Sequence, residues 1–488
     1  LVLGVYTPEK PAGGKKKPSH GVAVAELDEA LEGALSRQME RDEFTGKKEQ
    51  SLAISTLGRL KASRVVLLGL GEAGALTDGD LRTFAARAAR TANAEKAGSL
   101  ALALPAGLEG RLRFVGEGLE LGAYRFTKYL TGDRRPKAEL TKVTVVTAEK
   151  LPTSAKAQLE LGQSIGQAVN LTRDLGNEPP NVINPVTLAA AAQAMAKSHG
   201  VKIKVFDFKE IQRRGMTLIQ AVGQGSVNEP RFVHMTYTPP GRAKKRVVFV
   251  GKGITFDSGG LSIKPAPGMG DMKADMSGAG NMVGLMAAVA ALKPAVEVHA
   301  IIAAAENMPD GAAYRPGDVW GSLDGKTVEI VNTDAEGRLL LADALAYARD
   351  LQPDLLVDNA TLTGACVVAL GPTCSGFYAT SDEAAASFAS AVKESGETMW
   401  RMPLLEELRE QLKSDVADVK QTGDRYGGSI TAALFLREFI GETKHWVHVD
   451  IAGPALAERV TGWSPKGATG HGILTFLALI EQMGQGRG

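Results

Sequence analysis

Short apolar runs alternate with longer segments of helical periodicity along most of the chain. In the first third, residues 61–69 form a largely apolar run that predicts a buried strand, and residues 81–97 carry alanine and arginine at helical spacing. Residues 155–175 predict a long helix, which the three prolines within residues 176–185 end. Strands alternating with helices are typical of the α/β class, so we expect this class.

The alternation continues after this break. Further strands are predicted at residues 246–250, 296–304, 327–331, 354–359 and 446–450. Further helices are predicted near residues 279–292, 339–350 and 473–482. Strands separated by long helical crossovers imply a mostly parallel sheet with helices on both faces. In such a sheet, ligand-binding groups gather on the loops that follow the carboxyl ends of the strands.

The same patterns predict two domains joined by a helix. We expect a smaller N-terminal α/β domain at residues 1–150, a linker helix at residues 151–176, and a larger C-terminal domain at residues 177–488 that contains the mostly parallel central sheet. A length of 488 residues is sufficient for both domains.

Composition and charge exclude some classes of function. The chain is 44% hydrophobic and 23% charged, which is ordinary for a folded globular protein. Its net charge of +1 provides no global attraction to nucleic acid or to an anionic membrane. Two cysteines, Cys366 and Cys374, provide no disulfide framework and are expected to be small buried thiols, so we expect a cytoplasmic location. We see no export signal, although the sequence starts without Met and an upstream leader stays open.

Two segments without regular periodicity need separate interpretation. Residues 10–19, rich in Pro, Gly and Lys, predict a solvated surface loop. Residues 359–381 are uncharged and long enough to span a bilayer, but they are rich in Thr, Gly and Ser and contain Pro372. We interpret residues 359–381 as a buried or site-lining loop.

The segment Gly69-Leu-Gly-Glu-Ala-Gly74 matches the GxGxxG fingerprint of dinucleotide-binding proteins. It follows a predicted strand, but the expected ribose-binding acid about 20 residues further on is missing, since Glu95 lies in a predicted helix. We therefore favour a tight glycine turn over a cofactor site.

Three segments combine carboxylates with glycine and other small residues. They are residues 250–265, 271–279 and 332–338, of which the first and third follow predicted strands. Their candidate acids are Asp257, Asp275, Asp334 and Glu336. Brought together, four such charges would repel one another unless cations lay among them. The co-occurrence of the three loops therefore indicates a divalent metal site, with two ions about 3.5–4 Å apart as the simplest arrangement.

Each loop also has a simpler interpretation when it is taken alone. Asp334 and Glu336 could cap the helix predicted near residue 339, because acids suit a helix N-terminus. In an extended segment they could instead point to one side and reach one ion. Asp257 could be an ordinary turn acid.

Other catalytic patterns receive little support. His445 and His448 are close in the sequence but are expected to be structural, and no HExxH motif is present. Ser258 lies in Asp-Ser-Gly-Gly rather than in GxSxG, which argues against a serine nucleophile.

The three loops closely resemble the site loops of the leucyl aminopeptidase (cytosol aminopeptidase) family. NTDAEGR at residues 332–338 is similar to the family signature, and GKGITFDSGGLSIKP and DMKADMSGA match its other site loops. The similarity extends from about Asn177 to the C-terminus, whereas the N-terminal third is only generally similar. It implies a dinuclear metallo-exopeptidase whose C-terminal domain is catalytic.

The resemblance implies two divalent ions per chain and five ligands. The ligands are Lys252, Asp257, Asp275, Asp334 and Glu336. Asp257 and Glu336 would bridge both ions, Lys252 and Asp275 would complete the tighter site, and Asp334 would complete the exchangeable one. A lysine ligand must be neutral, so its pKa must fall far below about 10.4, as burial and adjacent cations favour; the alternative is a charged Lys252 paired with the acids. Zn²⁺ or Mn²⁺ is expected, with Co²⁺ or Mg²⁺ as options at the exchangeable site.

The implied reaction is hydrolysis of the first peptide bond by a water that bridges the two ions, which releases an N-terminal Leu or another apolar residue. Lys264 would polarise the peptide carbonyl as an electrophile. Arg338 would hold a bicarbonate ion that shuttles the proton. Ordinary pairing with nearby acids is the simpler role for both residues.

The resemblance also implies a pocket for the first side chain and an assembly. The pocket residues are Met272, Thr361, Gly364, Ala452 and Ala455. Ala455 stands where some members have Met, so the pocket could be roomier. The family forms a homohexamer of two trimers and acts on peptides; no membrane partner is implied, and the charge gives no reason to expect nucleic acid.

Two alternatives stay open. A dinuclear phosphoesterase would keep the metals and change the reaction. A DNA-binding or scaffolding role, with or without peptidase activity, would change the class of function, but the balanced charge and the complete ligand set make it the minor interpretation.

Overall fold

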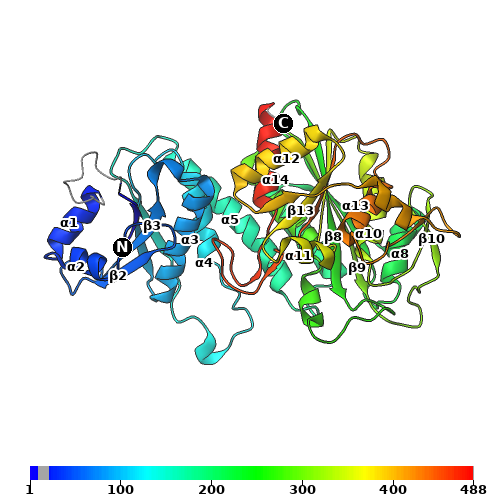
Figure 1. The fold of residues 1–488 in the computed structure, drawn as a ribbon, viewed down its shortest axis with the longest axis horizontal. Coiled ribbons are helices and arrows are strands. Elements are labelled where there is room, and N and C mark those ends of the chain that lie inside the picture. The colour runs from blue at the N-terminus through cyan, green and yellow to red at the C-terminus, as the bar shows by residue number, and fades with distance from the viewer. Residues whose placement is uncertain (9–20, 487–488) are drawn as a thin grey trace. The chain divides into compact units, whose positions relative to one another are not determined.

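The computed structural model describes residues 1–8 and 21–486 (Figure 1). The segment at residues 10–19, predicted to be a surface loop, lies outside the described residues. The chain forms two compact units. One comprises Leu1–Gln167 with Thr461–Pro465, and the other Ala168–Val460 with Lys466–Gly488. Helix α5 (Ala155–Asn177), where the sequence predicts a long helix, runs from the first unit into the second.

The N-terminal unit is built on a five-stranded sheet with helices on both faces. In spatial order the strands are β2 (Ser51–Ser55), β3 (Arg64–Gly71), β1 (Val2–Tyr6), β4 (Ser99–Ala103) and β5 (Lys142–Val146). The helices are α1 (Val22–Ala30), α2 (Ala34–Arg41), α3 (Asp78–Ala94) and α4 (Leu112–Ala123). Because side chains alternate along β1, Val2 packs in the core with α3 and α4, whereas Leu3 packs in the core with α1 and α2.

Helices α3 and α4 cross closely because glycine faces the neighbouring backbone. A Cβ atom at Gly118 would overlap the carbonyl oxygen of Arg82, and one at Gly122 would overlap that of Ala86. Next to this crossing, the buried Arg82 donates from Nε to Glu117 over 2.8 Å. Backbone contact and a buried ion pair together fix how the two helices meet.

The glycines at residues 69–74 serve packing in this unit. A Cβ atom at Gly69 would overlap the carbonyl oxygen of Lys47, and Gly71 has a φ of 75° at the end of β3. Helix α3 begins later, after Thr77, whose hydroxyl accepts a hydrogen bond from the N–H of Asp80 in a capping box. This geometry agrees with a tight glycine turn and lacks the helix that a dinucleotide fingerprint opens directly.

The C-terminal unit is built on an eight-stranded mixed sheet. In spatial order the strands are β14 (Met399–Arg401), β13 (Ser375–Ala379), β16 (Trp446–Asp450), β12 (Leu355–Ala360), β8 (Arg246–Asp257), β9 (Glu297–Asn307), β7 (Arg231–Tyr237) and β6 (Lys202–Phe206). From β16 through β12 and β8 to β9 the pairing is parallel, and β13, β7 and β6 add antiparallel pairs. The predicted α/β fold is confirmed, with the parallel part at the centre of the sheet.

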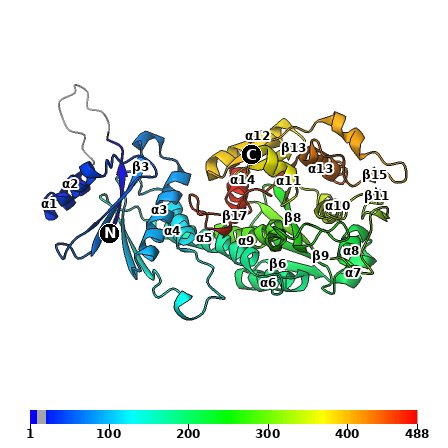
Figure 2. The same cartoon turned by 60° about the horizontal axis from the view of Figure 1, so that its bottom comes forward.

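Helices cover both faces of this sheet (Figures 1 and 2). One face carries α6 (Pro185–His199), α9 (Ser277–Leu292), α12 (Asp382–Ser395) and α14 (Ile473–Gln485), and the other α8 (Thr217–Gly223), α10 (Gly337–Arg349) and α13 (Gly428–Arg437). Within β8, Val248 shares a core with α10, whereas Phe249 packs on Phe476 of α14 with ring centroids 5.1 Å apart. The segment Met269–Leu292 is long and apolar enough to cross a membrane, but 83% of its apolar window is buried in the fold, as in a core helix.

Two predicted elements differ from the structure. The strand predicted at residues 327–331 is β11 (Thr327–Glu329), and it pairs in a separate three-stranded sheet with β10 (Val319–Gly321) and β15 (Val419–Lys420) instead of entering the central sheet. The loop predicted at residues 359–381 is wrong, since this segment contains α11 (Gly364–Leu370) and β13. The hydroxyl of Thr363 caps α11 by accepting from the N–H of Cys366 over 3.0 Å, which explains a helix in a segment rich in small polar residues.

A hairpin of the C-terminal unit has its tip in the N-terminal unit. Its strands, β17 (Leu456–Ala457) and β18 (Gly467–Ala468), pair in the C-terminal unit, whereas Thr461–Pro465 belongs to the N-terminal one. There the guanidinium of Arg82 lies 4.9 Å from the ring centroid of Trp463, and Arg90 donates to the carbonyl of Gly462.

The substitution Gly118→Ala should lower the free energy of unfolding by about 1–3 kcal/mol, because the overlap with the backbone of α3 outweighs a gain in helix propensity of at most ~1 kcal/mol. Thermal or chemical unfolding of the purified chain measures the effect. Gly74→Ala is the matched control, since its added methyl group meets open space. Equal unfolding curves for the two variants would contradict the packing argument.

Candidate active site

Three distant segments meet at the carboxyl end of the parallel strands. Lys252 and Asp257 lie on β8, and Asp275 follows the short 3₁₀-helix η3 (Met269–Ala274). Asp334 and Glu336 lie in the turn that leads into α10. Because η3 and α10 both pack against β8, their loops arrive at the end of the same strand.

Three carboxylates form the centre of the site. One oxygen atom from each of Asp257, Asp334 and Glu336 lies within 4.8 Å of the other two. Asp257 and Glu336 are buried, and Asp334 is partly exposed. Asp334 and Glu336 lie in the turn before α10 and not in the extended segment considered from the sequence. The turn nevertheless brings both carboxylates to the same place.

Asp275 joins this centre through Lys252. The Lys252 ammonium lies 2.8 Å from Asp275 Oδ2 and 3.1 Å from Glu336 Oε1, and it donates to the carbonyl of Thr361 over 2.8 Å. The lysine stem passes directly over Gly337, where a Cβ atom would overlap it. Glycine at position 337 therefore lets the buried lysine reach the acids.

Lys264 pairs with the acids on the other side of the site. Its Nζ lies 2.8 Å from Asp257 Oδ2 and 2.5 Å from Asp334 Oδ1. Burial opposes the charged form, but the attraction of Asp257 outweighs it and raises the pKa of Lys264. For Lys252, burial is likewise outweighed, by Asp275 and Glu336, and its pKa is raised. A neutral Lys252 therefore requires additional positive charge in the site.

Burial acts on the pKa values of the acids as well, and here it raises them because it disfavours the charged carboxylate. Desolvation raises the pKa of Asp275 to about 8 although Lys252 acts to lower it. Desolvation raises the pKa of Glu336, and the negative charge of Asp257 adds to this effect. Desolvation also raises the pKa of Asp334, although the hydrogen bond from Lys264 partly offsets it. Four acids face two lysines, which leaves a formal excess of two negative charges when all are ionised. The site therefore favours added cations.

The donor set fits divalent cations. Glu336 Oε2 is buried without a hydrogen-bond partner among the described residues, and such an oxygen is costly unless a cation or water meets it. Glu336 occupies the N-cap position of α10, yet its side chain makes no capping hydrogen bond, so capping does not explain it. Carboxylate oxygens are suitable ligands for Mn²⁺, Mg²⁺ and Zn²⁺.

Asn307 and Thr333, which the sequence analysis did not single out, hold Asp257 and its loop. Asn307 Nδ2 donates to Asp257 Oδ1 and to the carbonyl of Thr333, both over 2.8 Å. The Thr333 hydroxyl donates to the carbonyl of Gly259 over 2.7 Å and accepts from the N–H of Ser262 over 2.8 Å. The position of Asn307 at the carboxyl end of a strand that neighbours β8 was the available signal.

Arg338 lies in the first turn of α10 and is buried. Its Nη1 donates to the carbonyl of Gln421 over 3.0 Å, whereas Nε has no hydrogen-bond partner among the residues that the structure describes. Burial lowers its pKa to about 10, against the attraction of Glu336 and Asp450. A buried guanidinium with an unused donor is suited to binding an anion.

Two of the predicted pocket residues are tied to this framework by hydrogen bonds. The Thr361 hydroxyl donates to Asp275 Oδ1 over 2.7 Å. Asp450, at the end of β16, accepts from the backbone N–H groups of Leu362 and Ala452 over 3.2 and 3.1 Å. Asp450 thereby joins the loops that follow two neighbouring parallel strands.

The other three predicted pocket residues lie on adjoining segments. Met272 lies in η3, three residues before Asp275. Gly364 opens α11, and a Cβ atom there would meet open space. Ala455 is buried, with 4% of its surface exposed, so a longer side chain at this position would need room within the fold.

The histidines and cysteines considered from the sequence have structural surroundings. His448 is fully buried and its Nδ1 lies 2.5 Å from Asp358 Oδ1, and His445 hydrogen-bonds Ser381 over 2.9 Å. Both cysteines are free thiols. Cys366 is buried as predicted, and burial raises its pKa to about 12, whereas the prediction is wrong for Cys374, which is only partly buried. A raised thiol pKa argues against a nucleophilic role for Cys366.

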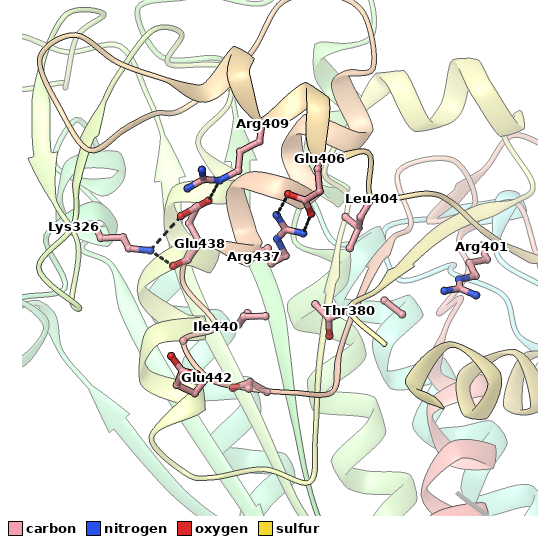
Figure 3. A pocket seen from close by; sticks show the side chains of 13 residues that line it. Lys326, Thr380, Arg401, Leu404, Glu406, Arg409, Arg437, Glu438, Ile440 and Glu442 are labelled. Atoms are coloured by element: carbon pink, nitrogen blue, oxygen red, sulfur yellow. Dashed lines mark hydrogen bonds and ion pairs between the residues drawn. The ribbon is translucent and has the colours of Figure 1, made fainter. Parts of the chain in front are cut away.

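A separate cavity of about 930 Å³ is lined by none of the predicted site residues (Figure 3). It includes the end of β13, which pairs with the amino end of β16, whereas the acids lie at the carboxyl ends of the parallel strands. Its charged groups largely satisfy one another: Arg437 Nη2 bonds Glu406 over 2.8 Å, and Arg409 Nε lies 2.6 Å from Glu438. We place the active site at the acids and not in this cavity.

The acid-rich site at the end of the parallel strands fits a metal-dependent enzyme, and sequence comparison gives its family. The chain matches the cytosol aminopeptidase family, catalytic domain, over residues 170–477, and the cytosol aminopeptidase family, N-terminal domain, over residues 2–133. The chain therefore belongs to the cytosol aminopeptidase family, as its site loops indicated. It is a metallo-aminopeptidase.

Individual relatives cover nearly the whole chain. Probable cytosol aminopeptidases of Aquifex aeolicus (strain VF5) and Geobacter sp. (strain M21) are 43% and 42% identical to it, over 94% and 99% of this chain and 93% and 96% of theirs. A solved mutant of tomato leucine aminopeptidase is 33% identical, with a TM-score of 0.87, over 99% of this chain and 93% of that one. The bottromycin maturation enzyme BotP in complex with Mn is 34% identical, with a TM-score of 0.85, over 99% of both chains.

The substitution Glu336→Gln should weaken the binding of divalent cations, because it removes one of the negative charges that the site holds in excess. The loss of affinity should exceed the roughly 10–100-fold that follows removal of a residue that only supports a ligand. Titration calorimetry with Mn²⁺ and metal analysis of the purified protein measure it. Glu329→Gln is the control. Glu329 is a partly buried acid on β11 that accepts a hydrogen bond from Ser414, and this variant should bind metal like the wild type.

Proposed function

We propose that this protein is a leucyl aminopeptidase that releases N-terminal Leu and other apolar residues from peptides with the help of two divalent ions. The observation that carries the proposal is the convergence of four acids and two lysines at the carboxyl end of the parallel strands, in a chain of the cytosol aminopeptidase family. A formal excess of negative charge in a largely buried site supports a requirement for cations.

The proposed ligands are those that the sequence implied. They are Lys252, Asp257, Asp275, Asp334 and Glu336. When bound, two divalent ions supply Lewis acidity, which lowers the pKa of a water molecule and polarises the peptide carbonyl. The Mn-bound relative BotP supports Mn²⁺ as one occupant, and Zn²⁺ suits the same donors.

Two basic residues are proposed to act on the reacting groups. Lys264 Nζ lies 2.8 Å from Asp257 and 2.5 Å from Asp334 and is partly exposed, so its ammonium group can donate to the carbonyl oxygen as negative charge develops there. Arg338 has an unused buried donor that can hold a bicarbonate ion, and this ion can accept and return the proton. The charge and burial of these two side chains support the roles.

The first side chain of the substrate is proposed to bind near η3, the start of α11 and the segment after β16. The pocket residues are Met272, Thr361, Gly364, Ala452 and Ala455. Small residues at most of these positions leave space for a side chain of the size of Leu. The hydrogen bonds that Asp450 accepts from both loops support a pocket of defined shape.

We further propose a homohexamer of two trimers and a cytoplasmic location. The proposed assembly follows from the family resemblance alone. The proposed location is supported by relatives that are named probable cytosol aminopeptidases. Two free cysteines are compatible with a reducing compartment.

The purified protein with Mn²⁺ or Zn²⁺ should hydrolyse leucine amide and leave an N-acetylated leucine amide intact, since the free amine is part of what the site binds. Chelation should abolish hydrolysis, and re-addition of each ion in turn should restore it. A phosphate monoester in a parallel assay should not react. Turnover of the phosphate ester alone would replace the proposed reaction with the phosphoesterase alternative.

The substitution Lys264→Met should lower kcat about 10²–10³-fold, because it removes a charged donor at the developing oxyanion while keeping the length of the side chain. Lys244→Met is the matched control: Lys244 donates to the backbone carbonyl of Gly484 over 2.7 Å, away from the site, and its loss should leave kcat close to that of the wild type. Steady-state kinetics on leucine amide distinguish the two. An unchanged kcat in the Lys264 variant would remove this lysine from the mechanism.

A further inference from the structure

Gln421, which follows β15, is fully buried beneath the loop that carries two of the proposed ligands. Its Oε1 accepts from the backbone N–H groups of Val331 and Asn332, over 3.1 and 3.2 Å. Its Nε2 donates to the carbonyl of Ala335 over 2.8 Å. One amide therefore holds the loop at three points.

The third of these points lies between the two ligands. Ala335 is the residue between Asp334 and Glu336, so a shift of its peptide would move both carboxylates. The main chain of Gln421 adds a fourth point, because its carbonyl accepts from Arg338 Nη1 over 3.0 Å. The same residue thus sets the positions of the two acids and of the guanidinium that follows them.

The chemistry of the side chain suits this task closely. A glutamine amide offers both an acceptor and a donor, and this loop uses both. With Gln421 fully buried, bulk water cannot take over the three backbone groups when the amide is lost. The backbone N–H of Gln421 bonds the carbonyl of Glu329 over 2.9 Å, so the small sheet of β10, β11 and β15 anchors the amide from below.

The two ligands proposed for the tighter ion alone are held by different contacts. Lys252 and Asp275 are bonded to Thr361, which follows β12 in the central sheet, and none of these three residues contacts Gln421 through a hydrogen bond within the described chain. A change at Gln421 should therefore act mainly on Asp334 and Glu336.

We propose that Gln421 is a positioning residue that fixes the spacing of Asp334, Glu336 and Arg338, and so sets the affinity of the exchangeable ion and the rate of the chemical step. This inference rests on the proposed function. It gives the three-stranded sheet a role as the support of the ligand loop.

Two variants test the inference in the full-length protein. Gln421→Glu keeps the shape and the acceptor but replaces the donor toward Ala335, and Gln421→Leu removes both functions. Titration calorimetry with Mn²⁺ should resolve two ions in the wild type. In both variants both ions should bind more weakly, because Glu336 is proposed to bridge them. The larger loss, about 10–100-fold, should fall on the exchangeable ion, which Asp334 also holds, and kcat on leucine amide should fall more than KM rises.

Asp418→Asn is the matched control on the same small sheet. Asp418 Oδ2 accepts from the N–H and the hydroxyl of Thr327, over 2.8 and 2.9 Å, and touches no part of the ligand loop through these bonds. This variant should bind both ions and turn over substrate like the wild type. Equal weakening of both ions in Gln421→Glu and in Asp418→Asn would show a general structural effect and overturn the positioning role.

Two further outcomes decide the proposal. Wild-type Mn²⁺ affinities and kcat in Gln421→Glu would overturn it, and this nearly isosteric variant carries the test if Gln421→Leu does not fold, as judged by circular dichroism. A wild-type protein that binds no Mn²⁺ and does not hydrolyse leucine amide would instead overturn the proposed function on which the inference rests.

Discussion

Concentrated negative charge at the end of the parallel strands is the constraint on which the rest of this structure depends. Asp257, Asp334 and Glu336 lie within a few ångströms of one another in a largely buried place, where like charges are costly. Two lysines offset part of that cost. One of them, Lys252, passes directly over Gly337, where any side chain would overlap it. Bound cations would offset the remaining repulsion between the carboxylates.

The acids hold their positions through polar groups that come from other elements of the fold. Asn307 bonds Asp257, Gln421 bonds the peptide before Glu336, and Asp450 joins the loops after β12 and β16. These supports lie at or just after the ends of strands, where the sheets hold their backbone in place. The positions of the acids therefore depend on the sheets as well as on the loops that carry the acids.

The sequence predicted the fold class and the acids, because both leave local signals. Strand and helix periodicities identified the α/β class, and glycine-rich acidic loops identified Asp257, Asp275, Asp334 and Glu336 as candidates. Among the supporting residues, Asn307 had a signal in its position at the end of a strand, whereas Gln421 had none. Gln421 lies far from residue 335 in the chain, and its role depends on backbone atoms that carry no residue identity. Likewise, β11 has the composition of a central strand but pairs elsewhere, since pairing is a tertiary choice.

The hairpin tip at Thr461–Pro465 has a consequence for the independence of the two units. The chain passes from one unit to the other three times: within α5, just before this tip and just after it. A single break in the backbone therefore does not divide the chain into the two units. A fragment that starts at Ala168 would still carry Trp463 but would lack Arg82, whose guanidinium lies 4.9 Å from the ring centroid. A cut at residue 168 would therefore separate the tip of this hairpin from the residues that it packs against.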